Sequence, residues 1–238
     1  MIYTKSQIIG STQVGADATM SIMGLFGIVE TAITECMSKQ HIDGLTIRRL
    51  YNAFWVFTKN KIKIFSNAQW GETVTVESFI SNISLAKLDV DTVVKRTDGS
   101  IVAYSRCEMC PLDITTERIR RTLTVGVDDT IVVETPLTDV VFDKYDDINL
   151  PVVDTVVVRS TNIDYSKHCN NVEYLRFILN TYSVEELLAR PFKKIEVCYI
   201  SQSYEGDELF VCKSSLDGVD TVAIKKDNQT VIKCQIHF

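Results

Sequence analysis

The chain has 238 residues, 45% of them hydrophobic and 24% charged, which is typical of one or two globular domains. The net charge of −6 argues against a nucleic-acid-coating protein, because such proteins need a cationic face to displace counterions from phosphates. The most apolar stretch, 18–29, is shorter than a membrane span, and residues 1–10 lack the pattern of a signal peptide. We therefore expect no nucleic-acid partner, no membrane association and a cytoplasmic location.

The cysteines form an odd set of seven in a chain that is large enough to fold without cross-links, which favours reduced thiols in the cytosol. Cys107 and Cys110 form one C-x-x-C pair, but a zinc site needs four ligands and no second pair follows at the usual spacing. We interpret both as small buried side chains and expect no metal. No phosphate-binding loop or dinucleotide-binding glycine pattern occurs, so we also expect no cofactor.

The first half of the chain predicts one long helix followed by antiparallel strands. A strand-like run leads into the polar residues 11–13, and apolar residues then recur at helical spacing from Ile22 to Met37. Runs rich in Val, Ile, Thr and aromatic residues follow as strands. Asp98 and Gly99, between two such runs, predict a hairpin turn because these residue types tolerate positive φ.

The second half repeats this plan. Polar residues 160–162 correspond to 11–13, and a second helical pattern runs from Val172 to Tyr182. The run 205–209 resembles 70–74, and the seven-residue spacing from Asp220 to Asp227 matches that from Asp91 to Asp98. Such self-similarity indicates two copies of one structural unit.

A long helix with little charge on any face is buried most simply when a sheet curls around it, which is the hot-dog arrangement. We therefore predict an α+β fold, a tandem (double) hot-dog in which each half is a central helix wrapped by an antiparallel sheet. The predicted domains are 1–125, a linker at 126–150, and 151–238, which carries the catalytic motif. The two units would pack as an internal pseudo-dimer, so a homodimer is not required and stays open.

Three histidines limit imidazole chemistry to few positions. His41 follows a helix end and His237 is the penultimate residue, so we interpret both as structural. His168 lies in the polar stretch 164–171, directly before the second helix, where Asn170 or Asn171 is a good N-cap. Free amides at a helix N-terminus can hold an oxyanion. From the residues alone, helix capping and catalysis are equally supported.

A wider motif favours catalysis. It resembles the signature of the acyl-acyl carrier protein (acyl-ACP) thioesterases, a plant and bacterial double hot-dog family, through Asp164, His168, Asn170, Asn171, Val172 and Tyr174. The similarity extends over nearly the whole chain, since 57–77 is similar to a strand pair of the same family. It implies hydrolysis of acyl-ACP to free fatty acid in fatty acid biosynthesis, with acyl carrier protein and a fatty acyl thioester as partners.

The resemblance implies a catalytic set in which Asp164 and His168 match the family. Ser166 stands where the family has Asn, and Gln202 stands where it has Glu, with Ser203 at the neighbouring Cys position; another count moves this neighbour to Ser201. An amide does not accept a proton at neutral pH. Two readings follow: Asp164 and His168 activate water while Gln202 orients it, which we favour, or the protein is a catalytically silent acyl-binding protein. An acyl-CoA thioesterase of the same fold is a further alternative.

The resemblance also implies a binding path for the substrate. The thioester carbonyl would lie near Asn170, Asn171 and Ser203, and the acyl chain in a tunnel lined by Ile22 and Phe26. Cys169, beside His168, suggests a nucleophile, but adjacent side chains seldom point the same way and we expect it to be inert. An acidic carrier protein needs a basic docking patch, for which the candidates are Arg48, Arg49, Lys59, Lys61, Lys63, Arg118, Arg120 and Arg121.

Overall fold

The computed structural model describes residues 1–133, 140–143 and 150–238. These residues form two compact units, Met1–Val141 and Phe142–Phe238, each with most of its contacts within itself. The division lies inside the segment 126–150 that we expected to link the domains. Residues 134–139 and 144–149 of this expected linker lie outside the described residues.

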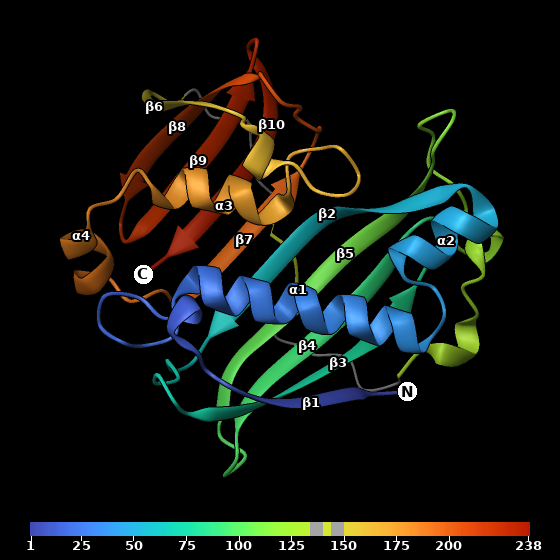
Figure 1. The fold of residues 1–238 in the computed structure, drawn as a ribbon. Coiled ribbons are helices and arrows are strands. Elements are labelled where there is room, and N and C mark those ends of the chain that lie inside the picture. Colours follow the sequence, from blue (N-terminus) through green and yellow to red (C-terminus); the bar gives the residue numbers. More distant parts are fainter. Residues whose placement is uncertain (134–139, 144–149) are drawn as a thin grey trace. The chain divides into compact units, whose positions relative to one another are not determined.

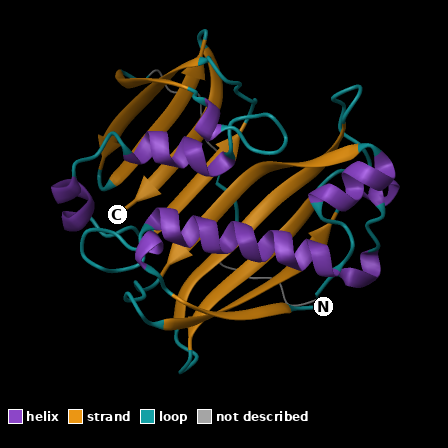
Figure 2. Ribbon diagram, viewed as in Figure 1, coloured by secondary structure: helices purple, strands orange, loops and turns teal. Residues whose placement is uncertain are grey.

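The first unit consists of a long helix, α1 (Ile22–Lys39), on an antiparallel sheet, as Figures 1 and 2 show. A shorter helix, α2 (Gly44–Tyr51), leads into β2, and the 3-10 turns η1 (Ser11–Gln13), η2 (Thr122–Val125) and η3 (Asp129–Ile131) complete the unit. The strands pair in the order β1 (Tyr3–Ile8), β3 (Thr73–Ile83), β4 (Leu88–Arg96), β5 (Ile101–Asp113) and β2 (Ala53–Ile64).

The second unit repeats this arrangement with a shorter helix, α3 (Asn171–Leu179), on its sheet (Figure 1). The 3-10 turn η4 (Ser160–Asn162) precedes α3, and a short helix, α4 (Val184–Ala189), follows it. The strands pair in the order β6 (Val152–Val157), β8 (Glu208–Leu216), β9 (Val219–Lys226), β10 (Gln229–His237) and β7 (Lys194–Tyr199). Each unit is thus a hot-dog domain, a helix packed on an antiparallel sheet, and the strand order is the same in both units.

The start of α1 explains how the helix is fixed to its unit. Ser21 is the N-cap, and its hydroxyl accepts a hydrogen bond from the Gly24 amide at 3.0 Å. A Cβ at Gly24 would lie 2.1 Å from the carbonyl oxygen of Gln13, so only glycine allows η1 to pack this closely. The apolar face of α1, including Leu25, Val29 and Ile33, is buried against the sheet.

Both predicted helices and the predicted hairpin turn at Asp98 and Gly99 are confirmed, and a matching turn lies at Asp227 and Asn228 in the second unit. Gly99 has φ +87°, and Asp227 and Asn228 have φ 47° and 66°, the left-handed conformation that these turns require. Tyr182 lies beyond the end of α3, where it follows a turn. The sequence analysis missed α2 and α4, which are too short to produce a clear helical period.

Other expectations from the sequence concern cysteines, metals and membranes. Cys107 and Cys110 are free thiols buried in β5, and residues three apart on a strand face opposite sides of the sheet, so this C-x-x-C pair cannot converge on one ligand. In the described ranges, no three His, Cys, Asp or Glu side chains form a group that could hold a metal ion. The described helices include none long and apolar enough to cross a membrane.

Candidate active site

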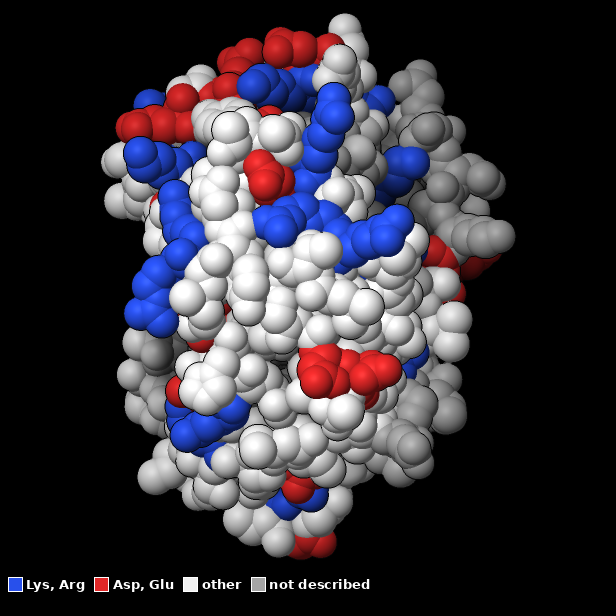
Figure 3. All heavy atoms as spheres, turned by 90° about the vertical axis from the view of Figure 1, so that its right-hand side faces the viewer, with Lys and Arg blue, Asp and Glu red and all other residues white. Residues whose placement is uncertain are grey.

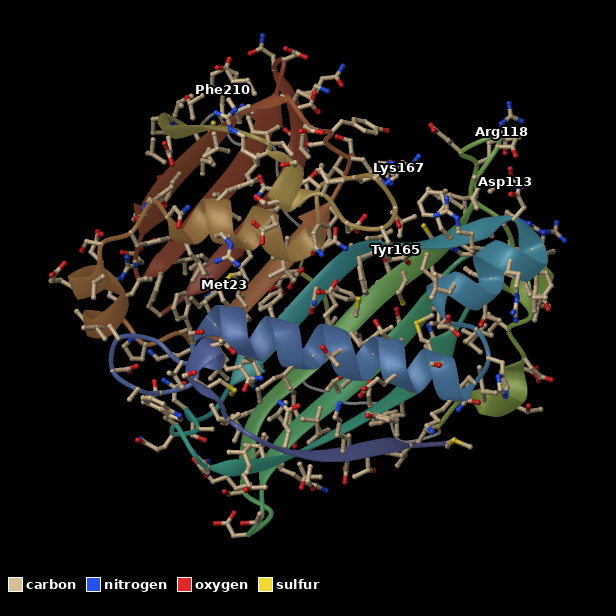
Figure 4. All side chains as sticks on the ribbon, viewed as in Figure 1. Met23, Asp113, Arg118, Tyr165, Lys167 and Phe210 are labelled. Atoms are coloured by element: carbon tan, nitrogen blue, oxygen red, sulfur yellow. The ribbon has the colours of Figure 1, made fainter. Side chains whose placement is uncertain are left out.

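The loop that precedes α3 presents His168. The Asp164 amide donates to the His168 carbonyl at 3.0 Å and closes the loop, and Lys167 has the left-handed φ of 67°. The Asp164 carboxylate accepts a hydrogen bond from the Ser166 amide at 2.7 Å. Figure 4 shows Tyr165 and Lys167 extending from this loop. Asp164 and Ser166 therefore shape the backbone turn from which the imidazole projects.

The N-terminus of α3 follows immediately. Asn170 is the N-cap, and its Oδ1 accepts a hydrogen bond from the Val172 amide at 2.9 Å, while Asn171 is the first residue of the helix. The Asn170 amide donates to the carbonyl of Asn162 in η4 at 2.8 Å. Of the two capping candidates in the sequence, Asn170 has this role, and the helix start with its partial positive charge lies two residues from His168.

A second segment, 201–207, lies against this loop. The Cys169 amide donates to the Ser203 carbonyl at 2.8 Å, and the His168 ring meets the Tyr204 ring edge to face, with 5.2 Å between centroids. The Asp207 carboxylate fixes the segment, because it accepts from the Tyr204 amide at 2.8 Å and from Lys226 Nζ at 2.7 Å. The structure therefore brings the His168 loop and the Gln202 segment together, as the motif predicted for the two parts of the site.

Alternate residues of this segment face opposite sides. Gln202 is half-buried and Tyr204 is exposed, whereas Ser203 between them is fully buried. Ser203 faces the inside of the unit, where Cys169 and Tyr174 are also buried. The site thus has an outer layer with His168 and Tyr204, and an inner layer with Cys169, Tyr174 and Ser203.

The inner position of Cys169 bears on the nucleophile hypothesis. Burial, with the nearby Glu173 carboxylate, raises the pKa of the Cys169 thiol to about 12. A thiol with such a pKa is almost entirely protonated at neutral pH, and the thiolate is the reactive form. The structure therefore supports the expectation that Cys169 is inert.

Sequence reasoning missed two aromatic residues of the site. Tyr204 contacts the His168 ring, and its position two residues after Gln202 on an extended segment could have indicated the shared side. Tyr174 was part of the recognised motif but received no role. Its ring lies beneath the site, in contact with Phe177 and Tyr199, with 6.3 Å and 6.5 Å between centroids.

The two candidate acyl-chain residues belong to the other unit. Ile22 and Phe26 both lie on the buried face of α1, in the first two turns of the helix, one turn apart. Met23, labelled in Figure 4, lies between them in the sequence and is half-buried. Their burial on one face suits an apolar lining within the first unit.

The structure corrects part of the expected basic patch. Lys61 is only 4% exposed and its Nζ donates to the Val141 carbonyl, so it belongs to the packed interior of the unit. Arg120 donates to the Tyr51 carbonyl, and to the Thr124 carbonyl at 3.1 Å, so its guanidinium holds the fold together. Arg48, Arg49, Arg118 and Arg121 are exposed. Figure 3, seen from the side of α2, shows Lys and Arg in separate groups between uncharged surface.

Comparison of the sequence with known proteins identifies relatives of both halves. Residues 145–237 match the family model of the acyl-ACP thioesterase C-terminal domain. Over 214 residues, covering 82% of this chain, the sequence is 27% identical to the chloroplastic acyl-acyl carrier protein hydrolase FATB1 of Cuphea viscosissima. It is 20% identical over 86% of the chain to the chloroplastic oleoyl-acyl carrier protein thioesterase 2 of Arabidopsis thaliana. The chain spans 49% and 60% of the length of these two relatives.

Solved structures show the same architecture. An acyl-ACP thioesterase from Bacteroides thetaiotaomicron matches with a TM-score of 0.91 at 19% identity, covering 100% of this chain and 97% of the other. The 12:0-ACP thioesterase of Umbellularia californica matches with a TM-score of 0.90 at 16% identity, covering 99% and 96%. The protein thus has the double hot-dog fold. Residues 145–237, within its second unit, match the model of the acyl-ACP thioesterase C-terminal domain, which confirms the resemblance seen in the sequence.

Proposed function

We propose that the protein hydrolyses acyl-ACP to free fatty acid and acyl carrier protein, as part of fatty acid biosynthesis. The observation that carries this proposal is the contact between the His168 loop and the Gln202 segment at the start of α3, inside the region that matches the family model. Both curated relatives bear names of enzymes that act on acyl carrier protein thioesters. These names favour acyl-ACP over acyl-CoA as the substrate class.

In the proposed reaction, His168 accepts the proton of a water molecule that attacks the thioester carbonyl. Asp164 and Ser166 hold the loop that presents the imidazole, and Gln202 orients the water. Asn170 and Asn171 place the start of α3 where the carbonyl oxygen gains negative charge, which the helix amides stabilise. The leaving thiol has a pKa of about 8.5, so it departs with little acid assistance. Ile22 and Phe26, on the buried face of α1 in the first unit, remain the residues proposed to contact the acyl chain.

The proposed carrier protein docks on the exposed arginines of the first unit. Arg48 and Arg49 lie on α2, and Arg118 and Arg121 lie in the segment after β5. The hydrogen bond from Arg120 to the Tyr51 carbonyl joins this segment to the end of α2. The four arginines thus belong to two segments joined at this point, and we propose that an acidic partner contacts both segments. A homodimer is not needed for this docking.

We place the protein in a reducing compartment such as the cytoplasm. Cys36, Cys107, Cys110, Cys169, Cys212 and Cys234 are buried free thiols, as in proteins that fold without disulfides. The two curated plant relatives are chloroplastic by name.

The proposal is tested by measuring free-thiol release from acyl-ACP and from acyl-CoA over a panel of chain lengths. We expect turnover of acyl-ACP, with kcat/KM at least about tenfold above that for the matched acyl-CoA, because a carrier adds docking contacts. Preference for acyl-CoA would contradict the carrier assignment. Turnover of neither, combined with tight binding of acyl-ACP, would leave a catalytically silent acyl-binding protein.

The silent alternative rests on Gln202 and Ser166, which replace the Glu and Asn expected from the family pattern. Gln202→Glu supplies a carboxylate that can accept a proton, and we expect it to raise kcat about tenfold. Asn67→Asp is the matched control, because Asn67 precedes Ala68 in the first unit as Gln202 precedes Ser203. The control should leave kcat unchanged. A decrease in Gln202→Glu would show that the amide itself is required.

A further inference from the structure

Two buried hydroxyls lie behind the His168 loop without partners. Ser203 is 0% exposed and Tyr174 is 2% exposed, and neither side-chain oxygen makes a hydrogen bond of regular geometry within the described part of the chain. An unpaired buried hydroxyl loses its hydrogen bonds to water and gains none, so such groups are rare in folded proteins. Because these two hydroxyls do not stabilise the fold, we looked for a functional role for them.

The two hydroxyls are neighbours. Burial is the main reason why the pKa of Tyr174 is raised. Ser203 and the Cys169 thiol also change this pKa, which shows that both lie close to the Tyr174 hydroxyl. The Tyr174 ring is held by Phe177 in an edge-to-face contact and by Tyr199. The Tyr174 hydroxyl thus lies close enough to Ser203 for the serine to alter its pKa.

The first unit shows what the fold requires at these two positions. The Met20 amide donates to the Ala68 carbonyl at 2.7 Å, just as the Cys169 amide donates to the Ser203 carbonyl, so Ala68 corresponds to Ser203. Leu25 lies four residues after the N-cap of α1, as Tyr174 lies four residues after that of α3. Ala68 and Leu25 are buried and apolar. The hydroxyls therefore occur only in the unit that carries His168.

We propose that Tyr174 and Ser203 are a positioning pair for the hydrolytic site. In the substrate-bound protein, the Tyr174 phenol donates a hydrogen bond to Ser203 Oγ and fixes the segment 202–204. Because Gln202 and Tyr204 face the opposite side of the same segment, this bond sets where they lie relative to His168. The proposal rests on the proposed function, since it assigns a role within the same reaction.

Tyr174→Phe removes the hydroxyl and keeps the ring. We expect kcat to fall about 10- to 100-fold with KM unchanged, because misplacement of reacting groups by a fraction of an ångström slows the chemical step. The melting temperature should stay the same or rise, since the lost hydroxyl has no partner in the free protein. Tyr182→Phe is the matched control. The Tyr182 phenol donates to Asp220 Oδ2 at 2.7 Å, so this variant should melt earlier and keep its kcat.

The double variant separates a coupled pair from two independent effects. Ser203→Ala should lower kcat as Tyr174→Phe does, and the double variant should lose no more than either single variant, because each hydroxyl acts through the other. Wild-type kcat in Tyr174→Phe, or additive losses in the double variant, would overturn the proposal. The proposed function is tested separately: the wild-type protein should release thiol from acyl-ACP, and His168→Ala should not. A wild-type protein without turnover removes both proposals.

Discussion

The loops before α1 and α3 have the same backbone and different side chains. The Gly15 amide donates to the Thr19 carbonyl at 2.8 Å, as the Asp164 amide donates to the His168 carbonyl at 3.0 Å. The fourth residue of each loop has a left-handed backbone, with φ 59° at Ala18 and 67° at Lys167. The first unit therefore builds the loop with no carboxylate and no imidazole at the positions of Asp164 and His168.

Comparing the two loops distinguishes the interactions that form the loop from the side chains proposed for catalysis. Both loops lead through an N-cap into a helix, and the residue before each N-cap is tied to the neighbouring segment by one main-chain hydrogen bond. Backbone hydrogen bonds and a tolerant turn residue are enough for this structure. The fold thus does not require an imidazole at position 168, and the matching residues of the first unit, Gly15 and Thr19, carry none of the proposed catalytic groups.

Equivalent substitutions in the two loops give the largest expected contrast. His168→Ala removes the proposed base and should lower kcat by about 10²–10⁴-fold, the usual contribution of a positioned acid or base. Thr19→Ala, at the same place in the first loop, should leave kcat unchanged. Both side chains are half-buried, so both variants should stay folded, as circular dichroism and melting curves can verify. Equal losses of activity in the two variants would contradict the assignment of chemistry to the second loop.

A second comparison concerns two buried acids at matching positions. Asp91 in β4 pairs with Arg106 through two hydrogen bonds of 2.7 Å, and Asp220 in β9 pairs with Arg190 at 2.9 Å. The arginine side chains are 15% exposed in the first pair and 31% exposed in the second. An ion pair is screened more when one partner is solvated, so the first pair should contribute more to stability.

Replacing each acid by its amide measures this difference. We expect Asp91→Asn to lower the free energy of unfolding by about 3 kcal/mol and Asp220→Asn by about 2 kcal/mol, because each removes the carboxylate that is hydrogen-bonded to the guanidinium. Denaturant titration at neutral pH compares the two variants with wild type. A larger loss in Asp220→Asn would show that its additional bond to Tyr182 outweighs the greater exposure of Arg190.

The second pair also has a defined pH dependence. Burial opposes ionisation of Asp220, but hydrogen bonds from Arg190 and Tyr182 prevail and lower the pKa of its carboxyl below the ordinary value. The ionised form is therefore favoured in the folded state, and its contribution is complete above the unfolded pKa of about 3.9. It is lost as the pH falls through the folded pKa. The stability difference between wild type and Asp220→Asn should narrow below about pH 4.

The sequence predicted the repeat because helix and hairpin signals are local. The apolar period from Ile22 to Met37 and the turn at Asp98 and Gly99 are both set by neighbouring residues. The contact between His168 and Tyr204 joins segments far apart in the chain, and only the resemblance of the motif brought Gln202 and Ser203 near it. The burial of Lys61 could not be predicted, because it depends on Val141 in a segment without a clear pattern.

The inner and outer layers of the site can finally be distinguished by thiol chemistry. With a pKa of about 12, Cys169 is ionised at pH 8 to only about one part in ten thousand, so alkylation by iodoacetamide should be slow. Cys198 is more exposed than the other cysteines and should react first, as peptide mass spectrometry can show. Acyl-ACP hydrolysis should persist after this modification. Loss of activity in step with alkylation of Cys169 would instead establish it as a nucleophile and place the inner layer in direct contact with the substrate.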